Sequence, residues 1–153
     1  MVHQCEIKKM AARPTLVVRI RTSIQDLPAK IGECFGKVMG YLGEIGEQPA
    51  DAPFVAYFNM DMSDLDVEIG FPVAKALPGK GEVKASQIPG GMAGTCMYTG
   101  PYTEFAVPYE ALTKLVSEKG LTPTGVSYEF YYNSPMDTEP SKLQTLIMFP
   151  LKG

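Results

Sequence analysis

The sequence repeats itself, and this repeat constrains the fold more than any other feature. Three short stretches of the first half recur in the second half in the same order. They are 56–59 (AYFN) with 130–133 (FYYN), 71–73 (FPV) with 149–151 (FPL), and 6–8 (EIK) with 82–84 (EVK). Their separations of 74, 78 and 76 residues are nearly equal, as expected for one module with small loop changes. We therefore predict a single domain, 1–153, made of two repeats at about 1–77 and 78–153.

Each repeat is expected to have the order β-α-β-β. The strand-like segments have alternating or β-branched character and are bounded by turn residues, and the helical segments have apolar residues at helical spacing. The predicted strands are 13–20, 54–59 and 64–73 in the first repeat and 92–99, 127–133 and 142–151 in the second, with helices at 27–44 and 103–119. One module alone leaves a sheet face and two sheet edges unsatisfied, so the two modules should pair. The predicted fold class is α+β, a duplicated β-α-β-β module whose antiparallel sheet carries two helices on one face and a ligand cleft on the other.

The two predicted helices differ in their signals. The second has Thr103 as candidate N-cap and Gly120 as a C-terminal stop. The first carries a glycine at every fourth position, Gly32, Gly36 and Gly40, and each costs about 1 kcal/mol relative to alanine. Such a stripe is typical of close packing against another helix or a second subunit, or of a loosely formed helix. We expect close packing.

Composition excludes several classes of function. The net charge is −3 and the basic residues form no stripe, which argues against direct nucleic-acid binding. The sequence has no apolar run long enough to span a membrane and no signal-peptide pattern, so a cytoplasmic location is expected. Three scattered cysteines and one histidine, His3, make a zinc site or a Ser-His or Cys-His nucleophile improbable. We expect neither a metal nor a cofactor.

Alternation along the strands predicts which side chains share a face. In the stretch 125–135 (GVSYEFYYNSP), Tyr128 and Phe130 are expected under the helices, and Glu129 and Tyr131 on the helix-free face. In the first repeat, Phe54 and Ala56 are likewise expected under the helices. The helix-free face should then carry Tyr57, Glu68, Glu129, Tyr131, Leu146 and Met148. Apolar and aromatic walls with one or two carboxylates are typical of a ligand cleft, whereas one wet sheet face would explain Glu68 equally well.

Glu129 is the strongest candidate among these residues. A carboxylate between large side chains of a central strand is costly unless it has a role. In the alignment of the two repeats Val55 occupies its position, so the carboxylate breaks the internal symmetry. An aromatic cleft with a buried negative charge favours planar organic cations, through ring stacking, cation–π contacts and a counter-ion. The same groups also suit acid/base or nucleophilic chemistry on an electrophilic ligand.

Three motifs together resemble the GyrI-like small-molecule-binding domain, which is also the effector-binding module of AraC-type and multidrug-sensing MerR-type regulators. They are 68–73 (EIGFPV), 99–102 (TGPY) and 128–135 (YEFYYNSP), and the resemblance covers essentially the whole chain. It implies two β-α-β-β modules around a ligand groove, with Glu129 at the pocket base and Tyr57 and Tyr131 stacking on ligands. Some members of this family hydrolyse cyclopropane-containing DNA-alkylating compounds. The chain has no tryptophan, so an activity that depends on one is not expected.

Three functions from different classes remain open at this point. The first, which we prefer, is a stand-alone binding protein for apolar or cationic small molecules, since about a dozen residues before the first predicted strand are too few for a helix-turn-helix. The second is a hydrolase in which Glu129 or Glu68 activates water and Tyr57, Tyr131 or Tyr102 donates a hydrogen bond. The third is a protein-interaction inhibitor of gyrase type, contacting its partner through the glycine-striped helix. A protein partner or a homodimer is compatible with each.

Overall fold

The computed structural model describes residues 2–134 and 136–152 of the chain. It divides into two compact units. One unit comprises Ala12–Pro89, and the other comprises Met1–Ala11 together with Gly90–Gly153. Pro135, which ends the aromatic motif 128–135, lies outside the described residues.

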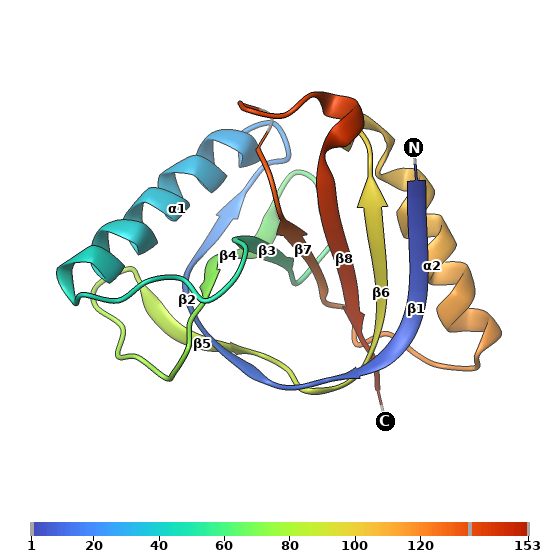
Figure 1. The fold of residues 1–153 in the computed structure, drawn as a ribbon, viewed down its shortest axis with the longest axis horizontal. Helices are drawn as coiled ribbons and strands as arrows, with labels where there is room; N and C mark the ends of the chain where they lie inside the picture. The colour runs from blue at the N-terminus through green and yellow to red at the C-terminus, as the bar shows by residue number, and fades with distance from the viewer. Residues whose placement is uncertain (1, 135, 153) are drawn as a thin grey trace. The chain divides into compact units, whose positions relative to one another are not determined.

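The unit Ala12–Pro89 contains four strands and one helix. Its elements are β2 (Arg13–Thr22), α1 (Leu27–Glu44), β3 (Phe54–Tyr57), β4 (Leu65–Pro72) and β5 (Lys84–Ile88). The strands pair antiparallel in the order β3-β4-β2-β5. Helix α1 lies along one face of this sheet, where the rings of Phe35 and Phe71 are 5.3 Å apart (Figure 1). The residues that β4 turns toward α1 are Leu65, Val67, Ile69 and Phe71, all of them buried as the alternation predicts.

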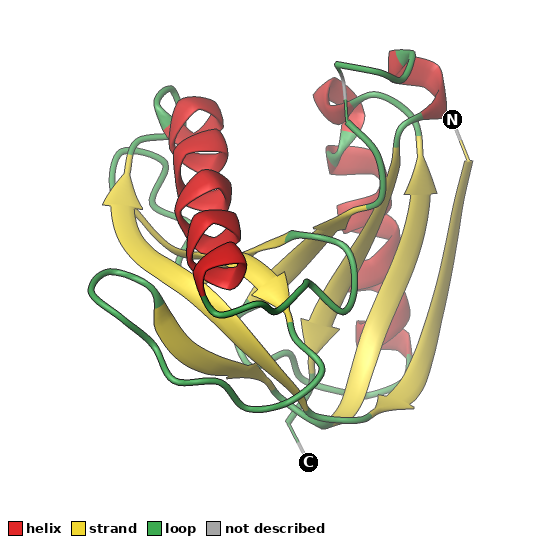
Figure 2. Cartoon of the chain, turned by 60° about the vertical axis from the view of Figure 1, so that its left-hand side comes forward, coloured by secondary structure: helices red, strands yellow, loops and turns green. Residues whose placement is uncertain are grey.

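The other unit has the same plan. Its elements are β1 (Val2–Met10), β6 (Gly91–Thr99), the 3-10 turn η1 (Tyr102–Glu104), α2 (Ala106–Glu118), β7 (Ser127–Tyr131), the 3-10 turn η2 (Pro140–Lys142) and β8 (Gln144–Pro150). The strand order is β1-β6-β8-β7, again antiparallel. Helix α2 packs on β1 and β6 (Figure 2). Leu112 and Val116 of α2 form a core with Cys96, Ile147 and Phe149 of the sheet.

The fold class is therefore α+β, with antiparallel strands and one α-helix in each unit, as the sequence predicts. Two strands of the described residues, β1 and β5, are not among the predicted ones. Each precedes the first predicted strand of its repeat, and each pairs in the unit formed mainly by the other repeat. β1 of the first repeat thus pairs with β6 of the second repeat, and β5 of the second repeat pairs with β2 of the first.

Equivalent hydrogen bonds mark the duplication. The Asn59 side chain accepts from the Asp66 backbone N–H at 3.0 Å and donates to the Asp64 carbonyl at 3.0 Å. The Asn133 side chain does the same at the corresponding loop, accepting from the Gln144 N–H at 2.9 Å and donating to the Lys142 carbonyl at 3.4 Å. The recurrence of this asparagine in the sequence therefore has a structural reason, because each side chain closes the loop between two paired strands.

The helix signals are partly confirmed. Helix α1 spans the predicted residues, and the chain turns away after α2 at Gly120, which has φ +69°. Thr103 is not the N-cap of α2, because it lies in η1 and the helix begins at Ala106. The residue at the cap position is Phe105, which makes no side-chain hydrogen bond to the helix end.

The glycine stripe of α1 is not closely packed against other described residues of the chain, so close packing stays a prediction only for a second subunit. A Cβ added at Gly32, Gly36 or Gly40 would meet nothing within 4 Å among the described residues. The helix nevertheless runs unbroken over 18 residues. Its stability therefore comes from the apolar row on its other side, which includes Val38 and Leu42.

Replacing Gly32 with alanine is expected to stabilise the protein by about 0.5–1 kcal/mol, because the new methyl group meets no neighbour and alanine loses less backbone entropy in a helix. The free energy of unfolding in urea measures the effect. A destabilised variant would show that the stripe does need close packing, for example against a second copy of the chain.

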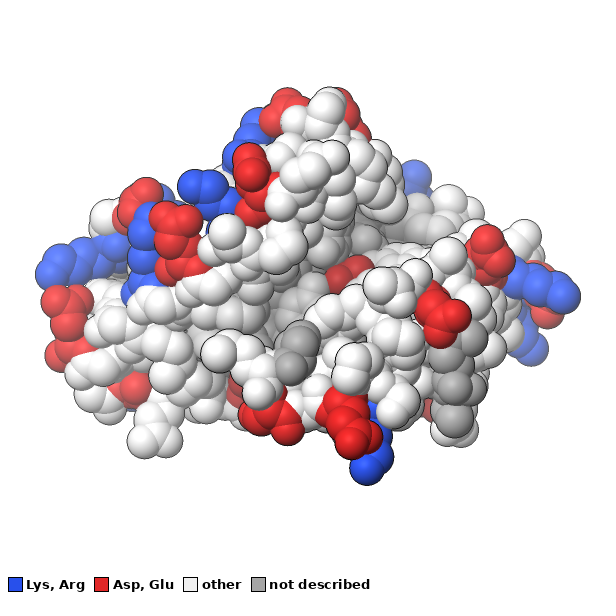
Figure 3. All heavy atoms as spheres, turned by 90° about the horizontal axis from the view of Figure 1, so that it is seen from above, with Lys and Arg blue, Asp and Glu red and all other residues white. Residues whose placement is uncertain are grey.

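The surface carries both signs of charge. Figure 3 shows acidic and basic side chains interspersed on the face in view, without a large area of one sign. This distribution agrees with the small net charge of −3. In the described part of the chain, no helix combines the length and the apolar character that crossing a bilayer requires.

Candidate functional site

Glu129 lies on the helix-covered face of its sheet, so the predicted facing of this residue is wrong. In the antiparallel register Glu129 is opposite Ile147, and Ile147 packs in the core with Leu112 and Val116 of α2. Residues directly opposite each other in an antiparallel pair share a face. Glu129 and Tyr131 therefore point to the α2 side, and Tyr128 and Phe130 point to the other.

Two tyrosine hydroxyls hold the Glu129 carboxylate. Tyr131, two residues along the same strand, donates to Oε1 at 2.6 Å. Tyr109, in the first turns of α2, donates to Oε2. The residue is 6% exposed, so Glu129 has a buried carboxylate with a hydrogen bond on each oxygen. Two such bonds stabilise a charge that burial alone would make costly.

Aromatic rings surround these hydroxyls in a connected chain. The ring centroids of Tyr131 and Tyr102 are 5.9 Å apart, those of Tyr102 and Phe105 are 5.1 Å apart, and those of Phe105 and Tyr109 are 6.3 Å apart. Phe149 of β8 extends the chain, with its ring 5.8 Å from that of Tyr109. We call Glu129, Tyr131, Tyr102, Phe105, Tyr109 and Phe149 the Glu129 site.

The electrostatics of the site extend to Tyr102. Burial raises the pKa of the Tyr102 hydroxyl, and the negative charge of Glu129 raises it further. Both effects keep the phenol protonated. Tyr102 is only half-buried, as are Phe105, Tyr109 and Tyr131, so the rings of the site are partly open to solvent while the carboxylate is not.

Leu146 and Met148 lie on the helix-free face as expected, but Glu129 does not share that face with them. Leu146 is opposite Phe130, and Met148 is opposite Tyr128, both on the face turned away from α2. Met148 is fully buried there. The two residues therefore line the other side of the sheet from the carboxylate.

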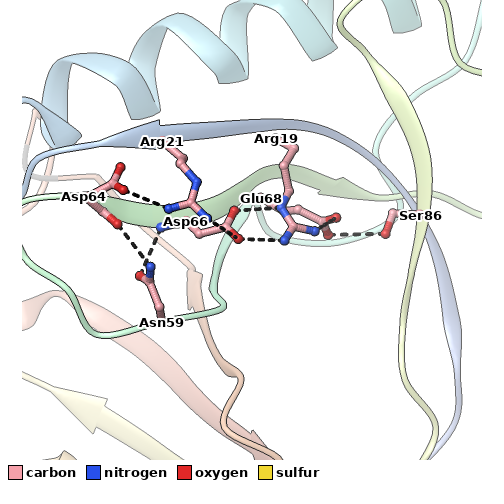
Figure 4. Close-up of polar contacts among 7 residues, drawn as sticks. All are labelled: Arg19, Arg21, Asn59, Asp64, Asp66, Glu68 and Ser86. Carbon is pink, nitrogen blue, oxygen red and sulfur yellow. Dashed lines mark hydrogen bonds and ion pairs between the residues drawn. The ribbon is translucent and has the colours of Figure 1, made fainter.

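Glu68, the second candidate carboxylate, belongs to the unit Ala12–Pro89 and is part of an ion-pair network (Figure 4). Its Oε2 lies 3.5 Å from Nη1 of Arg19, and its Oε1 accepts from the Ser86 hydroxyl at 3.2 Å. Arg19 also forms two 2.8 Å hydrogen bonds to Asp66. These bonds lower the pKa of Asp66, so this carboxyl is held in its charged form.

Tyr57 and Glu68 do not share a face either. Tyr57 is opposite Val67, which lies on the α1 side, whereas Glu68 is opposite Ala56 on the other side. The expected placement of Phe54 and Ala56 under the helix is wrong for the same reason, because Val55 and Tyr57 occupy that side. The two repeats agree on this point, since Val55 and Tyr57 are the counterparts of Glu129 and Tyr131.

Sequence reasoning missed three residues of the site, namely Phe105, Tyr109 and Phe149. Phe105 and Tyr109 read as the first members of the apolar row of the second helix, which continues through Leu112 and Val116. One signal could have separated Tyr109 from that row. A tyrosine at a core-facing position has a hydroxyl that needs a partner when buried, and an unexplained carboxylate is such a partner.

This arrangement can do two kinds of chemistry. Its electron-rich ring faces and its buried carboxylate can together hold an organic cation. The carboxylate and its phenol partners can also exchange protons with a bound molecule. Across residues 2–134 and 136–152, no three histidine, cysteine, aspartate or glutamate side chains come together in a way that could hold a metal ion.

Comparison with known proteins gives the family. The family model described as "GyrI-like small molecule binding domain" matches residues 3–152. The chain therefore belongs to this family of small-molecule-binding domains. No curated protein matches it in sequence.

Solved structures with the same fold include a complex with DNA and a complex with a small molecule. The C-terminal domain of EcmrR has a TM-score of 0.74 at 19% identity, covering 99% of both chains. EcmrR in its complex with DNA has a TM-score of 0.83 at 20% identity, covering 99% of this chain and 58% of EcmrR. SAV2435 bound to tetraphenylphosphonium has a TM-score of 0.69 at 11% identity, covering 98% and 94%. The chain thus spans little more than half of the EcmrR chain in the DNA complex.

Proposed function

We propose that this chain binds lipophilic organic cations, with Glu129 as the counter-ion. The observation that carries the proposal is the buried carboxylate held by the hydroxyls of Tyr109 and Tyr131 and ringed by aromatic side chains. Both hydroxyls donate to the carboxylate, which stabilises its charged form. The buried negative charge is therefore prepared before the ligand arrives, and it selects for positive charge.

The aromatic rings add to this selection. The half-buried rings of Tyr102, Phe105 and Tyr131 can contact a cation that binds near the carboxylate. These contacts replace part of the hydration that the cation loses on binding. A desolvated cation–π contact contributes about 2 kcal/mol, and area burial adds to it for any aryl compound. Apolar groups thus supply affinity, and Glu129 supplies the preference for cations.

The complex of SAV2435 with tetraphenylphosphonium supports this choice of ligand class, since that protein has the same fold. We further infer a cytoplasmic location, because Cys5, Cys34 and Cys96 are all free thiols. The bound compound is then either sequestered or reported to a protein partner.

Two ions of the same shape and opposite charge test the proposal. Tetraphenylphosphonium is expected to bind saturably at one site, and tetraphenylborate at least about 10-fold more weakly, because only the cation gains from a buried carboxylate. Isothermal titration calorimetry at low salt measures both. Equal affinity for the two ions, or no binding of tetraphenylphosphonium, would contradict the proposal.

A hydrolase acting on electrophilic ring compounds is a second candidate, favoured by the direct phenol–carboxylate bonds at Glu129. In such a reaction Glu129 takes a proton from water while the water oxygen bonds to a ring carbon. The ring bond that breaks passes its electron pair to a conjugated acceptor, which is protonated by a phenol. A solved structure described as a hydrolase from Listeria innocua has the same fold, with a TM-score of 0.67 at 15% identity, covering 97% of this chain and 92% of that one. Consumption of many equivalents of a cyclopropane-containing alkylating compound per protein would establish turnover, and stoichiometric uptake would reject it.

A further inference from the structure

Two cysteine thiols lie against each other in the unit that contains the Glu129 site. Cys5 of β1 is directly opposite Cys96 of β6, and the two Sγ atoms are 2.6 Å apart. Opposite residues of an antiparallel pair have Cα atoms about 4.5–5.5 Å apart, which falls within the range that a disulfide spans. The backbone therefore needs no large movement for a bond between these sulfurs.

The surroundings of the pair are those of a core rather than a surface. Cys96 is fully buried and packs with Leu112 and Val116 of α2, and Cys5 packs against the same cluster at its edge. The same cluster includes Tyr109 and Phe149, so the thiol pair borders the Glu129 site.

The two thiols differ in access and in acidity. Cys5 is half-buried and is therefore the more accessible of the two, since Cys96 is fully buried. Burial, together with the hydrogen bond from Cys5, raises the pKa of Cys96 to about 12. Cys96 therefore does not react first with an external oxidant, and its nearest electrophile would be a sulfur already oxidised at Cys5.

We propose that Cys5 and Cys96 form a reversible disulfide when the chain meets a low-molecular-weight disulfide such as oxidised glutathione. The Cys5 thiolate attacks one sulfur of glutathione disulfide, and one glutathione leaves as its thiolate. Cys96 then gives up its proton and attacks the Cys5 sulfur, and the second glutathione leaves. The two protein thiols lose two electrons and two protons, which reduce one glutathione disulfide to two glutathione molecules.

The bond would act on the N-terminal strand. β1 is at the end of the strand order of its sheet and is held to one neighbour, β6. N-terminal strands at a sheet edge open more readily than the rest of a domain. The link joins residues 91 positions apart and would keep β1 in place beneath α2. In a reducing compartment such a bond is transient, so it would respond to redox conditions.

The test uses the whole chain equilibrated with mixtures of reduced and oxidised glutathione. Free thiols are then blocked with N-ethylmaleimide, and the chain is digested without reduction. Mass spectrometry is expected to find the peptides of Cys5 and Cys96 joined and two hydrogens lighter, with Cys34 alkylated. The oxidised form is expected to have a thermal midpoint about 5 °C or more above the reduced form, reversed by dithiothreitol.

Two variants control for other pairings. Cys34→Ser should form the same link, because Cys34 lies in the other unit and takes no part in it. Cys5→Ser should lose both the link and the thermal shift, and its half-buried position makes loss of folding a small risk. Three alkylated thiols in excess oxidised glutathione would overturn the proposal. A stable glutathione adduct on Cys5, or a link through Cys34, would also overturn it.

Discussion

Replacing Glu129 with glutamine is expected to weaken tetraphenylphosphonium binding about 10–100-fold. Glutamine keeps the size of the side chain and can still bond the hydroxyls of Tyr109 and Tyr131, so the shape of the site is retained. What is lost is the full negative charge in a buried position, and a factor of 10–100 corresponds to about 1.4–2.7 kcal/mol. Binding of neutral triphenylphosphine oxide should change by less than about threefold, because it never used that charge. Titration calorimetry with both compounds measures the difference.

The matched control is Glu68→Gln, which removes the other candidate carboxylate. Glu68 is engaged by Arg19 and Ser86 in the unit Ala12–Pro89, so its loss should leave tetraphenylphosphonium binding unchanged. Thermal unfolding of both variants checks that each is folded. An equal loss for cation and neutral compound in the Glu129 variant would mean that the carboxylate serves only to order the site. A comparable loss in the Glu68 variant would give Glu68 a share in the counter-ion role.

The positions of most elements could be predicted from the sequence. Apolar spacing gave helix α1 with both ends correct, since Leu27 and Glu44 bound it in the prediction and in the structure. The strands β1 and β5 were missed because they are polar and mostly exposed, with sequences such as KASQI that give no buried alternating pattern. What makes them strands is pairing with the unit of the other repeat, which is a long-range property.

Glu129 could be singled out from the sequence, but its surroundings could not. Alternation tells which residues of a strand share a face, and it does not tell which face the helix covers. In β7 both faces are buried, because Tyr128 and Phe130 on one side are as hidden as Glu129 on the other. The larger aromatic row was therefore assigned to the helix side, and the assignment was inverted. Because of this inversion, Tyr109 of α2 was not predicted as the partner of Glu129.

Replacing Gly70 with alanine is expected to destabilise the protein by about 3 kcal/mol or more. Gly70 lies in β4 opposite Val17 of β2, within the motif 68–73 that resembles the GyrI-like family. A Cβ there would lie 2.0 Å from the carbonyl oxygen of Leu16 and 2.8 Å from the Cα of Val17. Both are backbone atoms of a strand paired on each side, by β4 and by β5, so no side-chain rotation can relieve the clash.

Gly94→Ala is the control for Gly70→Ala, because it replaces a buried strand glycine without a backbone clash. Its Cβ would lie 2.9 Å from Cγ2 of Val116 and 3.1 Å from Cδ1 of Leu112, which are side-chain ends of α2 that can shift. We expect about 1 kcal/mol of destabilisation, partly offset because alanine has a less flexible unfolded state than glycine. Urea unfolding of the two variants compares them. Gly70→Ala should cost more than Gly94→Ala only if the backbone of β2 cannot move. Equal destabilisation would therefore show that β2 can move away from β4 at Gly70.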